Sequence, residues 1–240
     1  MQKNRFQLQP KLIEQTLGQL HERIEERFPG SGLGKVCASL REISADAERR
    51  SNWLGRPLYW LRILTLLMIA VIIAALVGQF SLMQWTENDS LDWTELIQVM
   101  EAAINELFLI MAAIFFMVTL ENRYKRRKGL KAIHELRSIA HVIDMHQLTK
   151  DPASVLGAGR TASSPERDLS PADLMRYLDY CTEMLSLTGK LAALCMQSVR
   201  DEVVIHTVNE IEGLTTNLSS KIWQKIMIIR SEIDLPVPQH

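Results

Sequence analysis

Three glutamates and one asparagine lie inside or beside a long apolar run, where polar chemistry is unusual. The run 96–120 contains Glu101, Asn105 and Glu106, and Glu95 immediately precedes it. An ionised acid at the centre of a membrane helix costs roughly 2.5–3.5 kcal/mol, and such groups usually face a bundle interior or a water-filled cavity. Rings of carboxylates around a pore attract cations. These four residues are therefore candidates for an ion pathway.

The angular positions of the acids indicate how they would be shielded. At 100° per residue, Glu95 and Glu106 nearly eclipse each other, and Glu101 and Asn105 form a neighbouring polar stripe. One pair of helices cannot cover this face, so we expect a homo-oligomer with Glu95, Glu106 and Glu101 around its axis and Asn105 hydrogen-bonded to them. The structural alternative stays open: the acids could lie among lipid headgroups, or a neutral Glu106 could hold helices together.

The residues at the start of this run resemble one known family in a short motif. Asp92-Trp93-Thr94-Glu95 is similar to the Asp-x-x-Glu mouth of the mitochondrial calcium uniporter, which is also a pair of helices joined by a short acidic loop. The resemblance covers four residues and this layout. The sequence departs from the family at Leu91, where the family has Trp, and at Leu96, where it has Pro, so we do not assign the chain to it.

Two further sets of residues could carry chemistry in the second half of the chain. His134 and His141 share a helix face with Asp144 and could hold a divalent metal or an anionic ligand, although packing or subunit contacts explain them more simply. Arg200 and His206 resemble the Arg-x4–6-His spacing of HEPN ribonucleases, which are all-helical. This resemblance implies an anchored nuclease, against the simpler explanation of a solvated helix face.

No other pattern suggests catalysis or a bound cofactor. The chain has no Ser/His/Asp or Cys/His arrangement with catalytic spacing, and its three cysteines form no Cys-x-x-Cys pair. The segment 30–36 (GSGLGKV) lacks the spacing and the hydroxyl of a phosphate-binding loop, so we interpret it as a turn between helices. We therefore assign no catalytic residue and no cofactor, and with net charge −1 we expect no nucleic-acid partner.

The elements that position these residues begin with two apolar runs, 58–83 and 96–120. A bilayer core of about 30 Å requires about 20 helical residues, and both runs reach this length. The connection 84–95 is acidic and has no Lys or Arg, whereas arginines precede the first run and a basic cluster follows the second: Arg123, Lys125, Arg126, Arg127 and Lys128. Because basic residues stay on the cytoplasmic side, the sequence predicts a two-pass inner-membrane protein with both termini in the cytoplasm.

Apolar residues at helical spacing predict the rest of the chain. Residues 1–56 indicate a helical hairpin, 121–148 a basic helix that continues from the second membrane run, 149–170 a linker, and 171–240 further cytoplasmic helices. A heptad seam of eight apolar or small residues runs from Leu174 to Val199 and predicts helix packing, within the chain or between subunits. The fold class predicted is an all-α membrane protein, with a transmembrane hairpin flanked by a cytoplasmic helical bundle.

These observations favour two functions. The leading hypothesis is a small cation-conducting channel that is gated by its cytoplasmic helical domain. The alternative is a membrane-tethered interaction or sensor module, in which the helical domain binds a cytoplasmic protein or a small ligand. Apart from the low-priority nuclease pair, nothing in the sequence suggests an enzyme. The partners expected in either case are the lipid bilayer and further copies of the chain.

Overall fold

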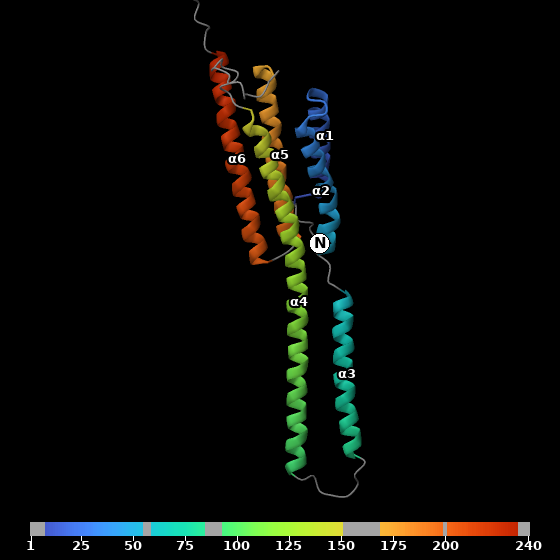
Figure 1. Ribbon diagram of the computed structural model, residues 1–240. Helices are drawn as coiled ribbons and strands as arrows, with labels where there is room; N and C mark the ends of the chain where they lie inside the picture. Colours follow the sequence, from blue (N-terminus) through green and yellow to red (C-terminus); the bar gives the residue numbers. More distant parts are fainter. Residues whose placement is uncertain (1–7, 55–58, 85–92, 151–168, 199–200, 235–240) are drawn as a thin grey trace, which may run out of the picture. The chain divides into compact units, whose positions relative to one another are not determined.

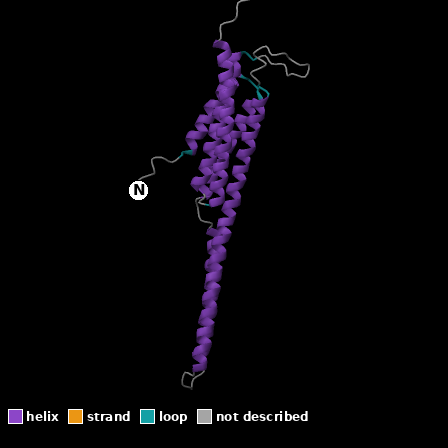
Figure 2. Ribbon diagram, turned by 90° about the vertical axis from the view of Figure 1, so that its left-hand side faces the viewer, coloured by secondary structure: helices purple, strands orange, loops and turns teal. Residues whose placement is uncertain are grey.

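The computed structural model describes residues 8–54, 59–84, 93–150, 169–198 and 201–234, and within these ranges it is all-helical with no strand (Figure 2). The all-α prediction is therefore confirmed. Six helices follow one another along the chain (Figure 1): α1 Pro10–Arg27, α2 Gly32–Leu54, α3 Tyr59–Gln84, α4 Trp93–Leu148, α5 Pro171–Ser198 and α6 Glu202–Asp234.

The chain divides into two compact units. The first combines Met1–Gly55 with Arg126–His240, and the second is Arg56–Lys125. The long helix α4 contributes to both units, its first part to the second unit and its last part to the first. We call the first unit the bundle and the second the helix pair. Most of the predicted linker, residues 151–168, and most of the predicted outer loop, residues 85–92, lie outside the described residues.

The bundle is held together by one core to which each of its helices contributes. α5 contacts α1, α2 and α6, and α1 packs on α2. The buried side chains follow the helical spacing of the sequence: on α1, for example, they are Ile13, Leu17, Leu20 and Ile24. On α5 the predicted heptad seam is buried from Leu174 to Ala192, with Cys195 half-buried. The described part of the seam therefore packs inside the chain, and Val199, its last predicted member, lies outside the described residues.

The turn between α1 and α2 explains the glycine-rich segment near residue 30. Gly30 has φ 67°, a conformation that favours glycine. Its backbone N–H donates to Glu25 Oε2 (3.0 Å), and the Gly34 N–H donates to Ser31 Oγ (3.1 Å) at the start of α2. The Ser31 hydroxyl thus satisfies one of the first N–H groups of α2. The segment is a helix–helix turn, as its spacing predicts.

Polar contacts fix α4 against α6 along the bundle. Arg126 Nε lies 2.8 Å from Asp201 Oδ2, and Arg137 Nη2 lies 3.1 Å from Glu210 Oε2. Near the end of α4, the Lys225 ammonium donates to the backbone carbonyl of Gln147 (3.1 Å) and to its side-chain Oε1 (2.7 Å). A cation at the carboxyl end of a helix satisfies exposed carbonyls and complements the helix dipole.

α5 and α6 approach closely where a glycine faces a threonine. A Cβ placed on Gly189 would lie 3.1 Å from Thr215 Oγ1, which is tighter than ordinary van der Waals contact. Gly189 and Thr215 are both buried, and Thr215 Oγ1 donates to the Glu212 carbonyl (3.1 Å). Because glycine in a helix interior costs about 1 kcal/mol relative to alanine, a close approach of this kind is a physical reason for its presence.

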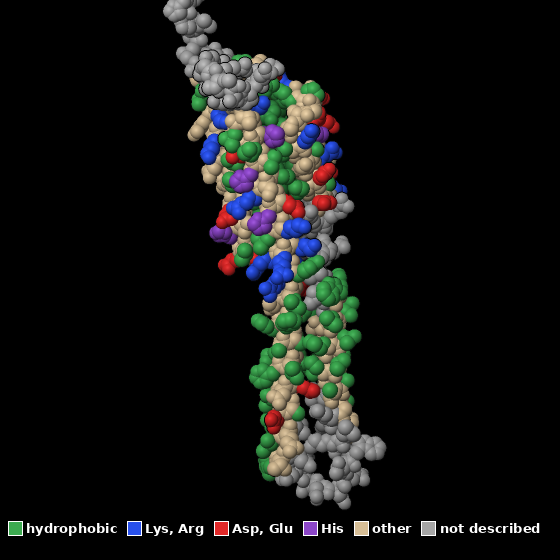
Figure 3. All heavy atoms as spheres, viewed as in Figure 1, with side chains coloured by type: hydrophobic (Ala, Val, Ile, Leu, Met, Phe, Trp, Pro, Cys, Tyr) green, Lys and Arg blue, Asp and Glu red, His purple; other side chains and the backbone are tan. Residues whose placement is uncertain are grey.

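In the helix pair, unlike in the bundle, the large apolar side chains lie mainly on the exposed sides of the helices. Thr65 of α3 is buried and its hydroxyl contacts Met117 Sδ of α4, so the two helices pack on each other. Most of the large apolar side chains described in this unit are exposed, Trp93 by 78% and Phe115 by 74%. In Figure 3, hydrophobic side chains cover most of the visible surface of α3 and of the adjacent part of α4.

Length and composition single out one of these helices as a candidate membrane span. Among the described residues, one segment is long and apolar enough to cross a bilayer, and it lies within Met100–Leu148 of α4; in α3 the corresponding apolar segment, Arg62–Ala75, is shorter. This favours an association with a membrane. The two-pass arrangement, the inner membrane and the cytoplasmic termini remain predictions.

Candidate functional sites: the polar face of α4 and a groove in the bundle

The structure separates the predicted intramembrane polar residues into two groups. Glu101 and Asn105 are exposed one turn apart on α4. Glu106 is half-buried, and its Oε2 is buried with no hydrogen-bond partner among the described residues. Glu95 lies in the first turn of α4, two residues after its start at Trp93, and its side chain lies outside the described part.

Glu106 lies on a different side of α4 from Glu101 and Asn105 because of how the helix packs. The partly buried side chains described for α4 in this unit recur every three or four residues: Ala102, Glu106, Ile110, Ala113, Met117, Glu121 and Lys125. Of these, Met117 contacts Thr65 of α3. Asn105 and Glu106 are 100° apart on a helix, so packing Glu106 into this row turns Asn105 outward. Glu106 therefore lies in the row that packs toward α3, whereas Glu101 and Asn105 lie on the exposed side of α4.

The predicted histidine stripe stays at the surface of the bundle. His134 and His141 are exposed on α4, and Asp144 accepts a hydrogen bond from Gln147 Nε2 at 2.7 Å. Within the described ranges, no group of three or more His, Cys, Asp or Glu side chains could hold a metal ion. The residues that share a helix face in the sequence thus do not converge into a metal centre.

Within the described part of the chain, acids contact at least two members of the basic cluster. Lys125 Nζ lies 2.7 Å from Glu121 Oε1 on the same helix, and Arg126 reaches Asp201 as described above. Arg123, Arg127 and Lys128 are exposed. Exposed basic side chains of this kind attract anionic lipid headgroups. The attraction contributes about 1 kcal/mol for each charge near a membrane surface.

The structure describes one of the two residues of the predicted nuclease pair. Arg200 lies outside the described residues. His206 is exposed, and its Nδ1 lies 3.6 Å from Glu210 Oε1, the same carboxylate that Arg137 contacts. In the described part of the chain His206 therefore takes part in a surface charge network between α4 and α6.

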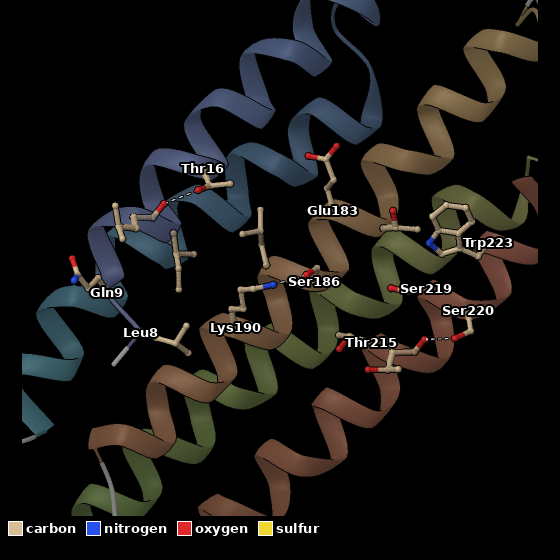
Figure 4. Close-up of a pocket in the computed structure, with 15 residues that line it drawn as sticks. Leu8, Gln9, Thr16, Glu183, Ser186, Lys190, Thr215, Ser219, Ser220 and Trp223 are labelled. Carbon is tan, nitrogen blue, oxygen red and sulfur yellow. Dashed lines mark hydrogen bonds between the residues drawn. The ribbon is translucent and has the colours of Figure 1, made fainter. Parts of the chain in front are cut away.

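A groove between α1, α5 and α6 was not anticipated from the sequence (Figure 4). It encloses about 820 Å³ and carries seven hydroxyl groups, from Thr16, Thr182, Ser186, Thr215, Thr216, Ser219 and Ser220. Lys190 Nζ donates to Ser186 Oγ at 2.6 Å, and Trp223 lies at the α6 side of the groove. Hydroxyls scattered over three helices give no sequence motif, because only packing brings them together.

Two thiols and a phenol are buried in the bundle core. Burial raises the pKa of the Cys37 thiol to about 11 and that of the Cys181 thiol to about 12. Burial likewise raises the pKa of Tyr177 above its ordinary value. These groups are therefore held in their neutral forms, as packing residues of the core are.

Comparison with protein-family models, with curated proteins and with solved structures found no match to this chain.

Proposed function

We propose that this chain is a two-pass inner-membrane protein, in which α3 and α4 span the bilayer, the bundle lies in the cytoplasm and several copies assemble into a cation-conducting pore. Membrane insertion is supported by the apolar side chains exposed over the helix pair, since a soluble protein rarely exposes a contiguous apolar surface of this kind. The acidic connection before α4 and the basic residues after it support the orientation.

The observation that carries the conducting role is the exposure of Glu101 and Asn105. They lie one turn apart on a face of α4 whose neighbours Met100, Ile104 and Phe108 are exposed and apolar. At hydrocarbon depth a carboxylate and an amide need polar surroundings, and one helix pair leaves both uncovered. Other copies of the chain would cover them, with the Glu101 carboxylates in a ring that attracts cations. Glu106 would add a second carboxylate between α3 and α4.

Conductance of the purified full-length protein in planar bilayers tests this proposal. We expect discrete cation currents from the wild type, a loss or large reduction with Glu101→Gln, and a smaller change with Glu106→Gln. Glu22→Gln removes the same charge from an exposed position of α1 and should leave the currents unchanged. Currents that are insensitive to Glu101→Gln, or none from a correctly assembled oligomer, would contradict the pore.

A second function is favoured by the groove in the bundle. According to this second function, the membrane helices only anchor the chain, and the groove between α1, α5 and α6 binds a cytoplasmic protein or a small ligand. Lys190→Ala should weaken that binding and leave any conductance unchanged, because the residue lines the groove within the bundle. Retained ligand binding with Glu101→Gln together with loss of binding on Lys190→Ala would favour the tethered module.

A further inference from the structure

α6 carries a second row of regularly spaced residues on its exposed side. Its buried row, which includes Val204, Val208, Ile211, Thr215, Leu218 and Ile222, packs into the bundle core. The exposed row consists of Asn209, Gly213, Thr216, Ser220, Trp223 and Met227. Its members are spaced alternately by four and three, which is the spacing of a helix-pairing seam. We call these six residues the α6 stripe.

The α6 stripe has no charged residue, although 23% of the chain is charged. Solvated faces of helices usually carry charged side chains. Two large apolar members lie at one end of the stripe, where Trp223 is 55% and Met227 is 54% exposed. Small residues occupy its middle, where a neighbouring helix could come close. A face with these properties is typical of a helix that has a packing partner outside the chain.

Gly213 gives an independent indication of such a partner. It lies within α6, where glycine costs about 1 kcal/mol relative to alanine. Unlike Gly189, it faces open space: a Cβ placed on Gly213 would meet nothing within 4 Å, and its φ lies outside the range that favours glycine. Nothing within the described chain therefore requires a glycine here, whereas close approach of another helix would.

The groove of Figure 4 adjoins the α6 stripe and could receive that helix. Thr216, Ser220 and Trp223 belong to both the stripe and the groove lining. On the opposite side the groove is bordered by α1, where Leu12 is 56% exposed. A helix packed along the stripe would thus lie between α1 and α6, over α5, and would cover apolar side chains of both.

We propose that the occupant is α6 of a second copy of this chain, paired in parallel so that the two α6 stripes face each other. In a parallel two-fold pair each residue meets its own counterpart, and an uncharged stripe can do this without repulsion. The residues that flank the α6 stripe are compatible with this parallel pairing. Glu212 would face Asn217 of the other copy, and Ser219 would face Gln224, so no like charges meet. This pairing involves the bundle alone and does not depend on conduction.

Disulfide cross-linking of the full-length protein tests the pairing. Ser220→Cys and Thr216→Cys lie on the stripe, and Lys221→Cys is the matched control on an exposed position beside it, all in a Cys195→Ala background. A disulfide requires Cα atoms within about 7 Å, which facing stripe positions meet and Lys221 does not. Under mild oxidation, we expect Ser220→Cys and Thr216→Cys to form a species of twice the chain mass, and Lys221→Cys to remain monomeric on non-reducing gels.

A charge placed in the stripe provides a second readout. Adding Ser220→Glu to the Thr216→Cys protein brings two carboxylates together and should lower the cross-linked fraction about tenfold or more, whereas Ser220→Gln should change it little. Equal cross-linking of all three cysteine positions, no cross-linking of the stripe positions, or cross-linking to a different protein would overturn the proposal. Because these outcomes are read from the position of the cross-link, they are independent of whether currents are observed.

Discussion

The bundle and the helix pair use apolar residues in opposite ways, and α4 contributes to both. In the bundle, Ile133, Leu136 and Ile143 of α4 are buried in the common core. In the helix pair, Leu109 and Phe115 of the same helix are exposed. Charged residues recur between the apolar ones in the bundle part and are missing from 107–120. The two parts of α4 thus differ less in their number of apolar residues than in the residues between them. Charged residues between apolar ones indicate a helix with one buried face, and their absence indicates a surface suited to lipid.

The same truncation in the two regions should have very different effects. Leu185→Ala in α5 removes a fully buried side chain from the bundle core and should lower the free energy of unfolding by about 2–5 kcal/mol. Leu109→Ala in α4 removes an exposed side chain and should cost well under 1 kcal/mol in detergent micelles, as substitutions outside a core usually do. Denaturant unfolding of the full-length protein, followed by circular dichroism, measures both. Equal losses of unfolding free energy in the two variants would contradict this difference between the bundle and the helix pair.

An inserted charge should show the opposite pattern, with a large effect in the helix pair and a small one on the bundle surface. Met111→Arg places an arginine on an exposed apolar side of α4 away from Glu101 and Asn105, and should impair membrane integration by roughly 2.5–3.5 kcal/mol if that side contacts lipid. Met145→Arg makes a similar change at an exposed apolar residue of the same helix within the bundle, with an expected effect under about 0.5 kcal/mol. Alkaline extraction of membranes measures the integrated fraction. Full integration of Met111→Arg would argue against a lipid-facing α4.

Much of the fold could be predicted because apolar spacing and core burial coincide along the bundle. Leu17 and Leu20 of α1 and Leu178 of α5 lie where their periodicity placed them. The interpretation of the Leu174 seam was less specific, because periodicity shows that a face is covered and does not show what covers it. One boundary differs from the prediction: α4 begins at Trp93, so Glu95 lies inside the helix and not in the predicted loop 84–95.

Alkaline pH should weaken the bundle through a thiol that the helix pair lacks. Burial raises the pKa of Cys181 to about 12, above its ordinary value near 9. The unfolded chain therefore loses this proton first, so the contribution is fully present below about pH 9 and is lost as pH rises from about 9 to about 12. Between pH 8 and pH 10 the loss is about 1 kcal/mol. Cys181→Ala should flatten the pH dependence of denaturant midpoints by this amount; an unchanged slope would contradict it.

The smallest expected effect concerns the start of α5. The Asp173 backbone N–H donates to Ser170 Oγ (3.1 Å), the Ser170 hydroxyl donates to Asp173 Oδ2 (2.7 Å), and Arg27 Nε donates to Asp173 Oδ1 (3.1 Å). The hydrogen bond from Ser170 and that from Arg27 lower the pKa of Asp173. Ser170→Ala should lower the bundle's stability by about 1 kcal/mol, measured by thermal unfolding, and should leave membrane integration unchanged. A change in integration would mean that the two regions are not independent.

The candidate sites were less predictable than the fold, for physical reasons. The sequence placed Glu106 in a helix with Glu101 and Asn105, but the side of α4 that faces α3 depends on both helices, and this side includes Glu106. The small residues Ala102 and Ala113, in one row with Ile110, are the sequence signal that could have indicated it. The groove depends on three helices distant in sequence, so no local spacing could reveal it.

The close approach of α5 and α6 also limits how the bundle can move. Gly189 opposes Thr215, and sliding α6 by one turn, about 5.4 Å, would bring Ile211 or Leu218, both larger than threonine, to the glycine. The contacts of Arg126 and Arg137 would be broken by the same displacement of α6 against α4. These contacts therefore oppose a one-turn slide of α6 along α5 and α4. A rotation or tilt of α6 would not require Gly189 to accommodate a larger side chain.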